Sequence, residues 1–238
     1  CAQRGIEIVP ATGGALPAVQ EEVLSLPGVH YGIFTNGAVV RDFGKNTWVS
    51  ESCLSWEKTI RVIEVLRRHP VIYDMYVSEG GVSETRLLAQ LEEYGISERE
   101  CAYIRATRRA VTDMVEYLRE KKCPVQKMNL NFKDRESKQA VRAKLEAMPE
   151  VLVTSSLPWN LELNAAGITK GSGLRNLCQY LGIEAEETMA FGDGENDWPM
   201  LEAAGIGVAM ENGAPFLKER ADRIAASNRE EGVAEAIR

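Results

Sequence analysis

Residues 188–210, TMAFGDGENDWPMLEAAGIGVAM, decide the fold because they predict a strand, a loop, a helix and a second strand in direct succession. Thr188 to Phe191 is short and apolar, Trp198 to Ala204 has helical spacing, and Ile206 to Ala209 is apolar again. Strands that alternate with helices in this way are typical of a parallel sheet covered by helices. The stretch therefore predicts an α/β fold.

The same alternation continues on both sides of this stretch. In this part of the chain we expect helices at Gly173–Leu181, Ala214–Ala221 and Glu231–Ile237. Near the start we expect strands at Ile6–Val9 and Tyr31–Phe34, a helix at Gln20–Leu26 and a hairpin at Val39–Trp48. These elements predict one Rossmann-like domain with a parallel sheet at its centre.

The middle of the chain follows another pattern, because strands and helices mix there without regular alternation. The expected helices are Ser55–Arg68, Thr85–Tyr94, Val111–Lys121 and Arg135–Met148, and the expected strands are Val71–Val77, Val125–Phe132 and Val151–Ser155. We interpret this part as an α+β domain inserted into the α/β domain. The predicted division is 1–47 and 159–238 for the core domain, with a short strand at Leu161–Leu163, and 48–158 for the insertion.

The composition excludes several classes of protein. The 238 residues carry a net charge of −7, which argues against a general nucleic-acid binder. No apolar run approaches the ~18 residues of a membrane helix, so we expect no membrane partner. The five cysteines are odd in number and form no C-x-x-C pair, which favours a reducing cytoplasm over a disulfide framework or a zinc site. With two histidines, a histidine metal cluster or a Ser-His-Asp triad is not expected.

The loop that follows the strand at 188–191 carries the chemistry. It offers carboxylates at Asp193, Glu195 and Asp197 and an amide at Asn196. Ligands bind beyond the carboxyl ends of strands in open parallel sheets, and hard oxygen ligands suit Mg²⁺. A plain acidic turn would not need this density of carboxylates. A calcium-binding loop is excluded, because no glycine follows Asp197 and the twelfth position would be Ala204.

Five stretches together resemble parts of the haloacid dehalogenase-like phosphatases. Gly192-Asp193-Gly194-Glu195-Asn196-Asp197 resembles their fourth motif, Gly167-Ile168-Thr169-Lys170-Gly171-Ser172-Gly173-Leu174 their third, and Ala11-Thr12-Gly13-Gly14 their second. Thr35-Asn36-Gly37-Ala38 and Asn212-Gly213-Ala214-Pro215 resemble signatures of the Cof-type members. The roughly 160 positions between Thr12 and Lys170 match members with a large α/β cap inserted after the second motif.

The resemblance implies a Mg²⁺-dependent, two-step displacement through an aspartyl phosphate. It implies that Asp193 ligates Mg²⁺ and that Asp197 supports the metal's hydration shell or braces the loop. Lys170 and Thr12 become the catalytic residues, with Lys170 neutralising the phosphate. The implied phosphate- or substrate-binding residues are Gly13, Asn36, Gly37 and Asn196, with Asn196 either orienting Lys170 or contacting phosphate.

The sequence departs from the family pattern at its beginning. The first motif, an Asp-x-Asp pair, is absent, since none of the aspartates before Lys170 is followed by x-Asp-Gly. Ala2-Gln3-Arg4-Gly5 has the pattern of a helix end that runs directly into a strand. We therefore expect that a preceding βα unit has been left off; an unusual natural N-terminus is the alternative. Gly14 stands where Cof-type relatives often have arginine.

The leading hypothesis is a Mg²⁺-dependent phosphatase of small phosphorylated metabolites, with sugar phosphates as one class and residues 48–158 as a cap. The alternatives are a non-catalytic truncated homologue that binds phosphate and metal, and a phosphomutase. Without the nucleophile, the 238-residue polypeptide is expected to be inactive. No feature indicates a protein partner, and the basic run Arg105, Arg108 and Arg109 is interpreted as a solvated surface rather than a substrate clamp.

Overall fold

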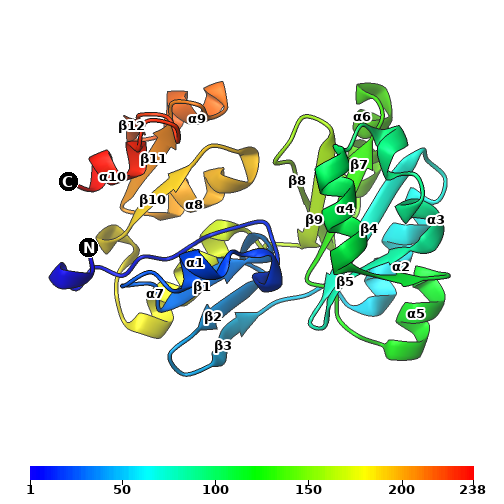
Figure 1. Cartoon of the computed structure of the whole chain (residues 1–238), viewed down its shortest axis with the longest axis horizontal. Helices are drawn as coiled ribbons and strands as arrows, with labels where there is room; N and C mark the ends of the chain where they lie inside the picture. Colours follow the sequence, from blue (N-terminus) through cyan, green and yellow to red (C-terminus); the bar gives the residue numbers. More distant parts are fainter. The chain divides into compact units, whose positions relative to one another are not determined.

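The computed structural model describes residues 1–238, apart from the side chains of Ala2 and Ala18. The chain divides into two compact units, one made of Cys1–Glu51 and Ile168–Arg238 and the other of Ser52–Gly167 (Figure 1). The second unit is therefore a continuous insertion into the first. This arrangement confirms the predicted fold class, an α/β core with an inserted α+β domain.

The first unit contains two three-stranded sheets. One is antiparallel, in the order β1 (Tyr31–Phe34), β2 (Val39–Asp42) and β3 (Thr47–Glu51). The other is parallel, in the order β10 (Met189–Gly192), β11 (Ile206–Met210) and β12 (Arg223–Ala225). The helices of this unit are α1 (Glu21–Leu24), α7 (Lys170–Leu181), α8 (Trp198–Ala203), α9 (Pro215–Arg220) and α10 (Gly232–Ile237).

Helix α7 and Ala11 connect the two sheets. Leu174 of α7 packs against a cluster around Ala190 and Leu201, next to the parallel sheet, and also against a cluster around Ile33, next to the antiparallel sheet. Ala11 packs against the same two clusters. The helix begins with a capping box, in which Thr169 and Ser172 exchange hydrogen bonds between side chain and backbone, so its first residue is fixed.

The strand expected at 6–9 does not form. Only Ala11 makes an isolated parallel bridge, to Ile33, with the Thr12 N–H donating to the Ile33 carbonyl at 2.9 Å. On the other side, β10 pairs with β11, and no strand in the described part of the chain pairs with its second edge. Strand β10, which leads into the acidic loop, therefore has one edge whose N–H and C=O groups have no partner strand among the described residues.

The second unit is built on one six-stranded sheet. The strand order is β6 (Arg108–Val111), β5 (Gly80–Glu84), β4 (Val71–Val77), β7 (Lys127–Phe132), β9 (Asn160–Ala165) and β8 (Val151–Thr154). Its helices are α2 (Trp56–Leu66), α3 (Thr85–Leu88), α4 (Glu98–Thr107), α5 (Met114–Lys121) and α6 (Arg135–Glu146). A single apolar core joins the sheet and the helices, with Met75, Leu130 and Phe132 almost fully buried.

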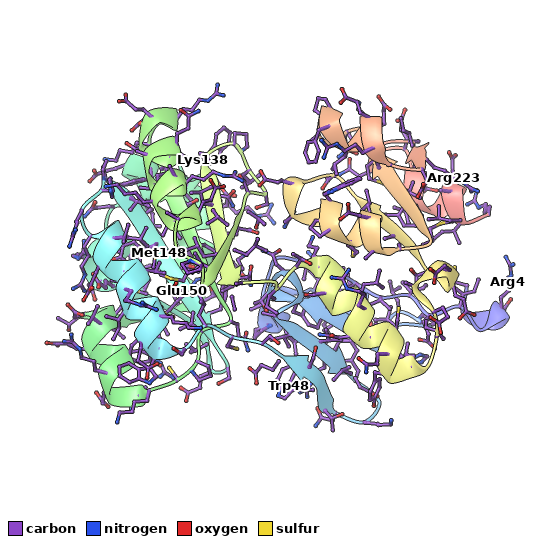
Figure 2. The ribbon with its side chains drawn as sticks, turned by 180° about the vertical axis from the view of Figure 1, so that it is seen from behind. Arg4, Trp48, Lys138, Met148, Glu150 and Arg223 are labelled. Atoms are coloured by element: carbon purple, nitrogen blue, oxygen red, sulfur yellow. The ribbon has the colours of Figure 1, made fainter. Side chains whose placement is uncertain are left out.

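Polar contacts fix the end of this sheet near β8 and β9. Lys138 of α6 donates hydrogen bonds to the Ser155 hydroxyl and the Pro158 carbonyl, both at 2.9 Å. Glu150, just before β8, pairs with Arg61 of α2 at 2.6 Å. Figure 2 labels Lys138 and Glu150 at these two places. These contacts hold the β8–β9 hairpin to the helices.

The observed division differs from the predicted boundaries of 48 and 158. Strand β9 pairs with β7 and β8, so residues 160–165 belong to the second unit, which runs on to Gly167. The three arginines of the basic run, Arg105, Arg108 and Arg109, also differ in burial. Arg108 is buried and pairs with Asp74 at 2.8 Å, whereas Arg105 and Arg109 are exposed. The interpretation of a solvated surface is therefore wrong for Arg108.

All five cysteines are free. Among the described residues, no helix is both long enough and apolar enough to cross a bilayer.

Candidate functional site

The candidate site lies in the first unit, where the loop after Ala11 meets the turn after β1. The Thr12 hydroxyl accepts a hydrogen bond from the Gly14 N–H at 3.0 Å. The Thr12 carbonyl accepts from the Asn36 N–H at 3.2 Å, and the Gly14 carbonyl accepts from the Thr35 N–H at 2.9 Å. Because its oxygen accepts within the loop, the Thr12 hydroxyl can still donate its own hydrogen to a ligand.

The turn of residues 35–37 is held in a strained shape against α7. Thr35, Asn36 and Gly37 have φ angles of 48°, 59° and 92°, in the left-handed region. A Cβ atom at Gly37 would lie 2.0 Å from the Thr169 carbonyl oxygen, so only glycine fits here. The glycine therefore lets the turn approach the first residues of α7, where Lys170 lies.

Lys170 and Asp197 form a buried ion pair. The Lys170 ammonium donates to Asp197 Oδ1 at 2.5 Å, and both side chains are at most 8% exposed. Asp197 Oδ2 accepts the N–H groups of Asp193 and Gly194, each at 2.9 Å. Both oxygens of Asp197 are thus used to hold Lys170 and the acidic loop. Of the two roles left open by the sequence, this geometry corresponds to bracing.

Asn196 ties the acidic loop to the turn after β1. Its side-chain amide donates to Asn36 Oδ1 at 3.0 Å, and both side chains belong to buried residues. The amide group of Asn196 thereby joins the acidic loop to the turn after β1. The roles suggested by the sequence, orienting Lys170 or contacting phosphate, stay predictions.

Asn212 is a functional candidate to which the sequence reasoning gave no role. Its side-chain amide donates to Asp193 Oδ2 at 3.1 Å, and its own Oδ1 accepts the Asn228 N–H at 3.0 Å. The Ala214 N–H also donates to the Asp193 carbonyl at 2.9 Å. Asp193 is therefore oriented by the turn after β11. The signal in the sequence was the stretch Asn212-Gly213-Ala214-Pro215, which resembles a Cof-type signature.

The loop carboxylates give a partial fit to a magnesium ion. Asp193 is exposed, and its Oδ1 is available as a hard oxygen ligand. However, no group of three or more histidine, cysteine, aspartate or glutamate residues converges as a metal site in the part of the chain that the structure describes. The residues present supply one ligand and do not form a closed magnesium site.

The geometry brings the sequence-predicted residues together as one constellation. Hydrogen bonds or close backbone contacts connect the loop at Thr12 and Gly13, the turn at Asn36 and Gly37, Lys170 at the start of α7, and the acidic loop. A hydroxyl donor, an ammonium group and backbone amides at one place are suited to a phosphate group. The exposed carboxylate of Asp193 belongs to the same connected set of loops.

Comparison with known proteins defines the class. The chain matches the family model of the haloacid dehalogenase-like hydrolases over residues 1–237, and it belongs to this family. Phosphatase YwpJ of Bacillus subtilis is 31% identical over 261 aligned residues, which cover 100% of this chain and 89% of YwpJ. A solved haloacid dehalogenase-like hydrolase from B. subtilis superimposes with a TM-score of 0.83 at 26% identity, covering 99% of this chain and 88% of the other.

A shorter match has higher identity. The 5-amino-6-(5-phospho-D-ribitylamino)uracil phosphatase YcsE of B. subtilis is 41% identical over 112 residues. That match spans 47% of this chain and 45% of YcsE, less than half of either protein. The family resemblance inferred from the motifs is thereby confirmed, and the relatives are named as phosphatases.

Proposed function

We propose that this protein is a Mg²⁺-dependent phosphatase of small phosphorylated metabolites, acting through an aspartyl phosphate. The observation that carries the proposal is the convergence of Thr12, Lys170 and Asp193 through one hydrogen-bonded set of loops. Catalysis of phosphoryl transfer depends mainly on positioning and charge compensation, and these residues supply both.

Each residue has a defined role in this proposal. The Thr12 hydroxyl and the Gly13 amide donate to phosphoryl oxygens, and the Lys170 ammonium neutralises the negative charge that gathers there. Asp197 keeps Lys170 in place, and Asn36 with Gly37 shapes the turn beside it. Bound Mg²⁺, with Asp193 as one ligand, would supply further compensation of phosphate charge.

The 238 residues contain no Asp-x-Asp-Gly sequence, and therefore no nucleophile of the family's kind. We infer that this polypeptide on its own binds phosphate without turning over phosphate esters. The second candidate function is a non-catalytic protein that binds phosphate and metal. The two differ in whether a supplied Asp-x-Asp segment restores turnover.

The substrate class rests on the relatives. YcsE is named for a phosphate ester of a ribityl chain, and we propose sugar and polyol phosphates as the first compounds to test. A phosphomutase would convert a sugar phosphate into its isomer, whereas a phosphatase would release inorganic phosphate. We further propose that the unit Ser52–Gly167 acts as the cap and that the protein works in the cytoplasm, where its free cysteines stay reduced.

Phosphate binding by the 238-residue chain tests the site without requiring turnover. We expect inorganic phosphate to shift the backbone amide signals of residues 12–14 and 169–171 in NMR spectra. Thr12→Val should weaken this binding about five- to tenfold, because it removes a hydroxyl that donates to a charged ligand. The matched control is Thr188→Val, at a partly buried threonine just before β10 whose hydroxyl bonds to Ala185. Shifts confined to other regions, or equal losses in both variants, would contradict the proposal.

A further inference from the structure

The turn after β11 and the turn after β12 lie next to each other. Strands β11 and β12 pair in parallel, so their carboxyl ends are side by side (Figure 1). The N–H of Glu211, just after β11, donates to the carbonyl of Ala225, the last residue of β12, at 2.9 Å. The two turns therefore begin at neighbouring positions. The first contains Asn212 and the second consists of residues 227–230.

The turn of residues 227–230 is held in shape by Ser227. The Ser227 carbonyl accepts the Glu230 N–H at 2.9 Å. The Ser227 hydroxyl donates to Glu230 Oε2 at 2.9 Å and accepts the Arg229 N–H at 3.3 Å. Both polar groups of Ser227 thus bind within the turn. These contacts set the direction of the N–H of Asn228, which lies between them in the chain.

The side-chain amide of Asn212 fits its two neighbours in one orientation only. The Asn228 N–H is a donor and meets Asn212 Oδ1 at 3.0 Å, whereas the Asp193 carboxylate is an acceptor and meets Asn212 Nδ2 at 3.1 Å. The reversed amide would place donor against donor and acceptor against acceptor. An aspartate at this position could accept from Asn228 but would repel Asp193. Asn212 therefore links the turn of residues 227–230 to Asp193 by a contact that needs an amide.

This link acts on the one part of Asp193 that its backbone does not fix. The Asp193 N–H donates to Asp197 Oδ2 and its carbonyl accepts the Ala214 N–H, both at 2.9 Å. The bond from Asn212 holds Asp193 Oδ2 and leaves Oδ1 for a cation. Asn212 and Asn228 are exposed, so water competes for both hydrogen bonds and each is weak. Such a link adjusts the orientation of a ligand group without holding the fold together.

We propose that the turn of residues 227–230 sets the affinity of Asp193 for a divalent cation through Asn212. Asn212 is a positioning residue in this scheme, because it contacts Asp193 and not the cation. The inference rests on the proposed role of Asp193 as a Mg²⁺ ligand. Without Asn212 the carboxylate can rotate, and a cation must order it on binding, which lowers the affinity.

Titration of the 238-residue protein with Mg²⁺, followed by amide NMR at constant ionic strength, tests this link. We expect the signals of residues 193–195 and of Asn228 to shift with one common dissociation constant. Asn212→Ala should weaken Mg²⁺ binding about three- to fivefold and leave the Asn228 signal unmoved by Mg²⁺. Asn176→Ala is the matched control. It removes a similar amide hydrogen bond, from Asn176 to Ser50 Oγ at 3.2 Å, and Asn176 lies on α7 outside the two turns.

A second variant tests whether the turn acts through Asn212. Ser227→Ala removes the hydroxyl contacts of the turn and should weaken Mg²⁺ binding about twofold. In the Asn212→Ala background the same change should have no further effect, because the link is already broken. Urea unfolding of each variant checks that the fold is intact, so that a lost shift is assigned to the site.

The expected result is a common dissociation constant that Asn212→Ala abolishes and Asn176→Ala retains. Additive effects of the two substitutions, or an Asn228 signal that still follows Mg²⁺ in Asn212→Ala, would overturn the proposal. Binding that Asp193→Asn abolishes and Asn212→Ala leaves unchanged would overturn the link alone. No shift of residues 193–195 up to about 20 mM Mg²⁺ would overturn it together with the role of Asp193 as a ligand.

Discussion

Replacing Lys170 by methionine tests whether Asp197 braces the site through a buried ion pair. Methionine keeps most of the apolar length of the side chain but removes the ammonium group. Asp197 would keep its two backbone N–H donors at 2.9 Å and lose its charged partner at 2.5 Å. Removing one partner of a buried pair costs ~3–5 kcal/mol, and the two remaining hydrogen bonds place the expected loss near ~3 kcal/mol.

Urea unfolding followed by circular dichroism measures this loss. The double variant K170M/D197N removes both charges and leaves an amide oxygen that can accept from the backbone. We expect it to be at least ~1 kcal/mol more stable than the sum of the single losses predicts. Lys218→Met is the control, because Lys218 pairs with Glu211 where the two side chains are 28% and 59% exposed, and its loss should stay below ~1 kcal/mol. Equal losses for K170M and K218M, or additive losses in the double variant, would refute the bracing role.

Three further changes give distinct results. Gly37→Ala should destabilise the protein by more than ~2 kcal/mol, because the new Cβ meets a carbonyl oxygen at 2.0 Å, whereas Gly95→Ala, at a φ of 71° with open space, should cost only ~1 kcal/mol. Burial raises the pKa of Asp113, but hydrogen bonds from the first turn of α5 and from Arg67 lower it by more, so its folded pKa lies below the usual value. The stability that Asp113 contributes is therefore complete above the unfolded pKa of ~3.9 and is lost as pH falls through the folded pKa, and the difference between wild type and Asp113→Asn should shrink below about pH 4. Asp193→Asn should weaken Mg²⁺ binding, followed by titration calorimetry, without changing the unfolding midpoint, because this carboxylate is exposed.

Each of these predictions has a result that would contradict it. Equal destabilisation by the two glycine variants would mean that the contact with Thr169 relaxes freely. A stability difference for Asp113→Asn that stays constant, or grows, as the pH falls below 4 would contradict the sign of the pKa shift. A lower unfolding midpoint for Asp193→Asn would mean that Asp193 is a structural residue of the loop.

The sequence predicted the helices and strands of the first unit best where a regular pattern of apolar residues is followed by a residue that ends the element. The helix expected from Gly173 begins at Lys170, because Thr169 caps it, and it ends at Leu181, before Gly182, which has a φ of 70°. Strand β1 has the predicted bounds, since a short apolar run is followed by the left-handed turn of residues 35–37. By contrast, a strand at 6–9 would need a neighbouring strand to pair with. The nearest bridge is at Ala11, and residues 6–9 themselves form no ladder.

The second unit contains most of the elements that the sequence did not predict, and β12 (Arg223–Ala225) of the first unit was not predicted either. Strand β5 begins with Gly80-Gly81, a pair with low strand propensity, and it forms because β4 and β6 pair with it on both sides. Helix α4 buries Cys101 as its one fully buried residue among the described side chains, so its apolar period is weak. Tertiary pairing, which a local pattern does not contain, determines both elements.

For the candidate site, the residues were predictable and their contacts were not. The motif resemblance selected Thr12, Lys170 and the acidic loop, which the structure joins through hydrogen bonds. It included Asn212 in a signature but gave it no role, because its contact with Asp193 depends on the neighbouring position of β10 and β11. The choice between bracing and metal support for Asp197 likewise depends on which atoms its two oxygens meet.

The most direct test of the phosphatase proposal adds an Asp-x-Asp carboxylate pair to the chain. A designed apolar strand ending in Asp-x-Asp-Gly is fused ahead of Cys1, where it can pair with the open edge of β10, and phosphate release from p-nitrophenyl phosphate is measured with Mg²⁺. We predict Mg²⁺-dependent release that falls at least ~10³-fold when the first aspartate of the segment is replaced by asparagine. Equal rates for the aspartate and asparagine segments, with both proteins folded, would contradict the account.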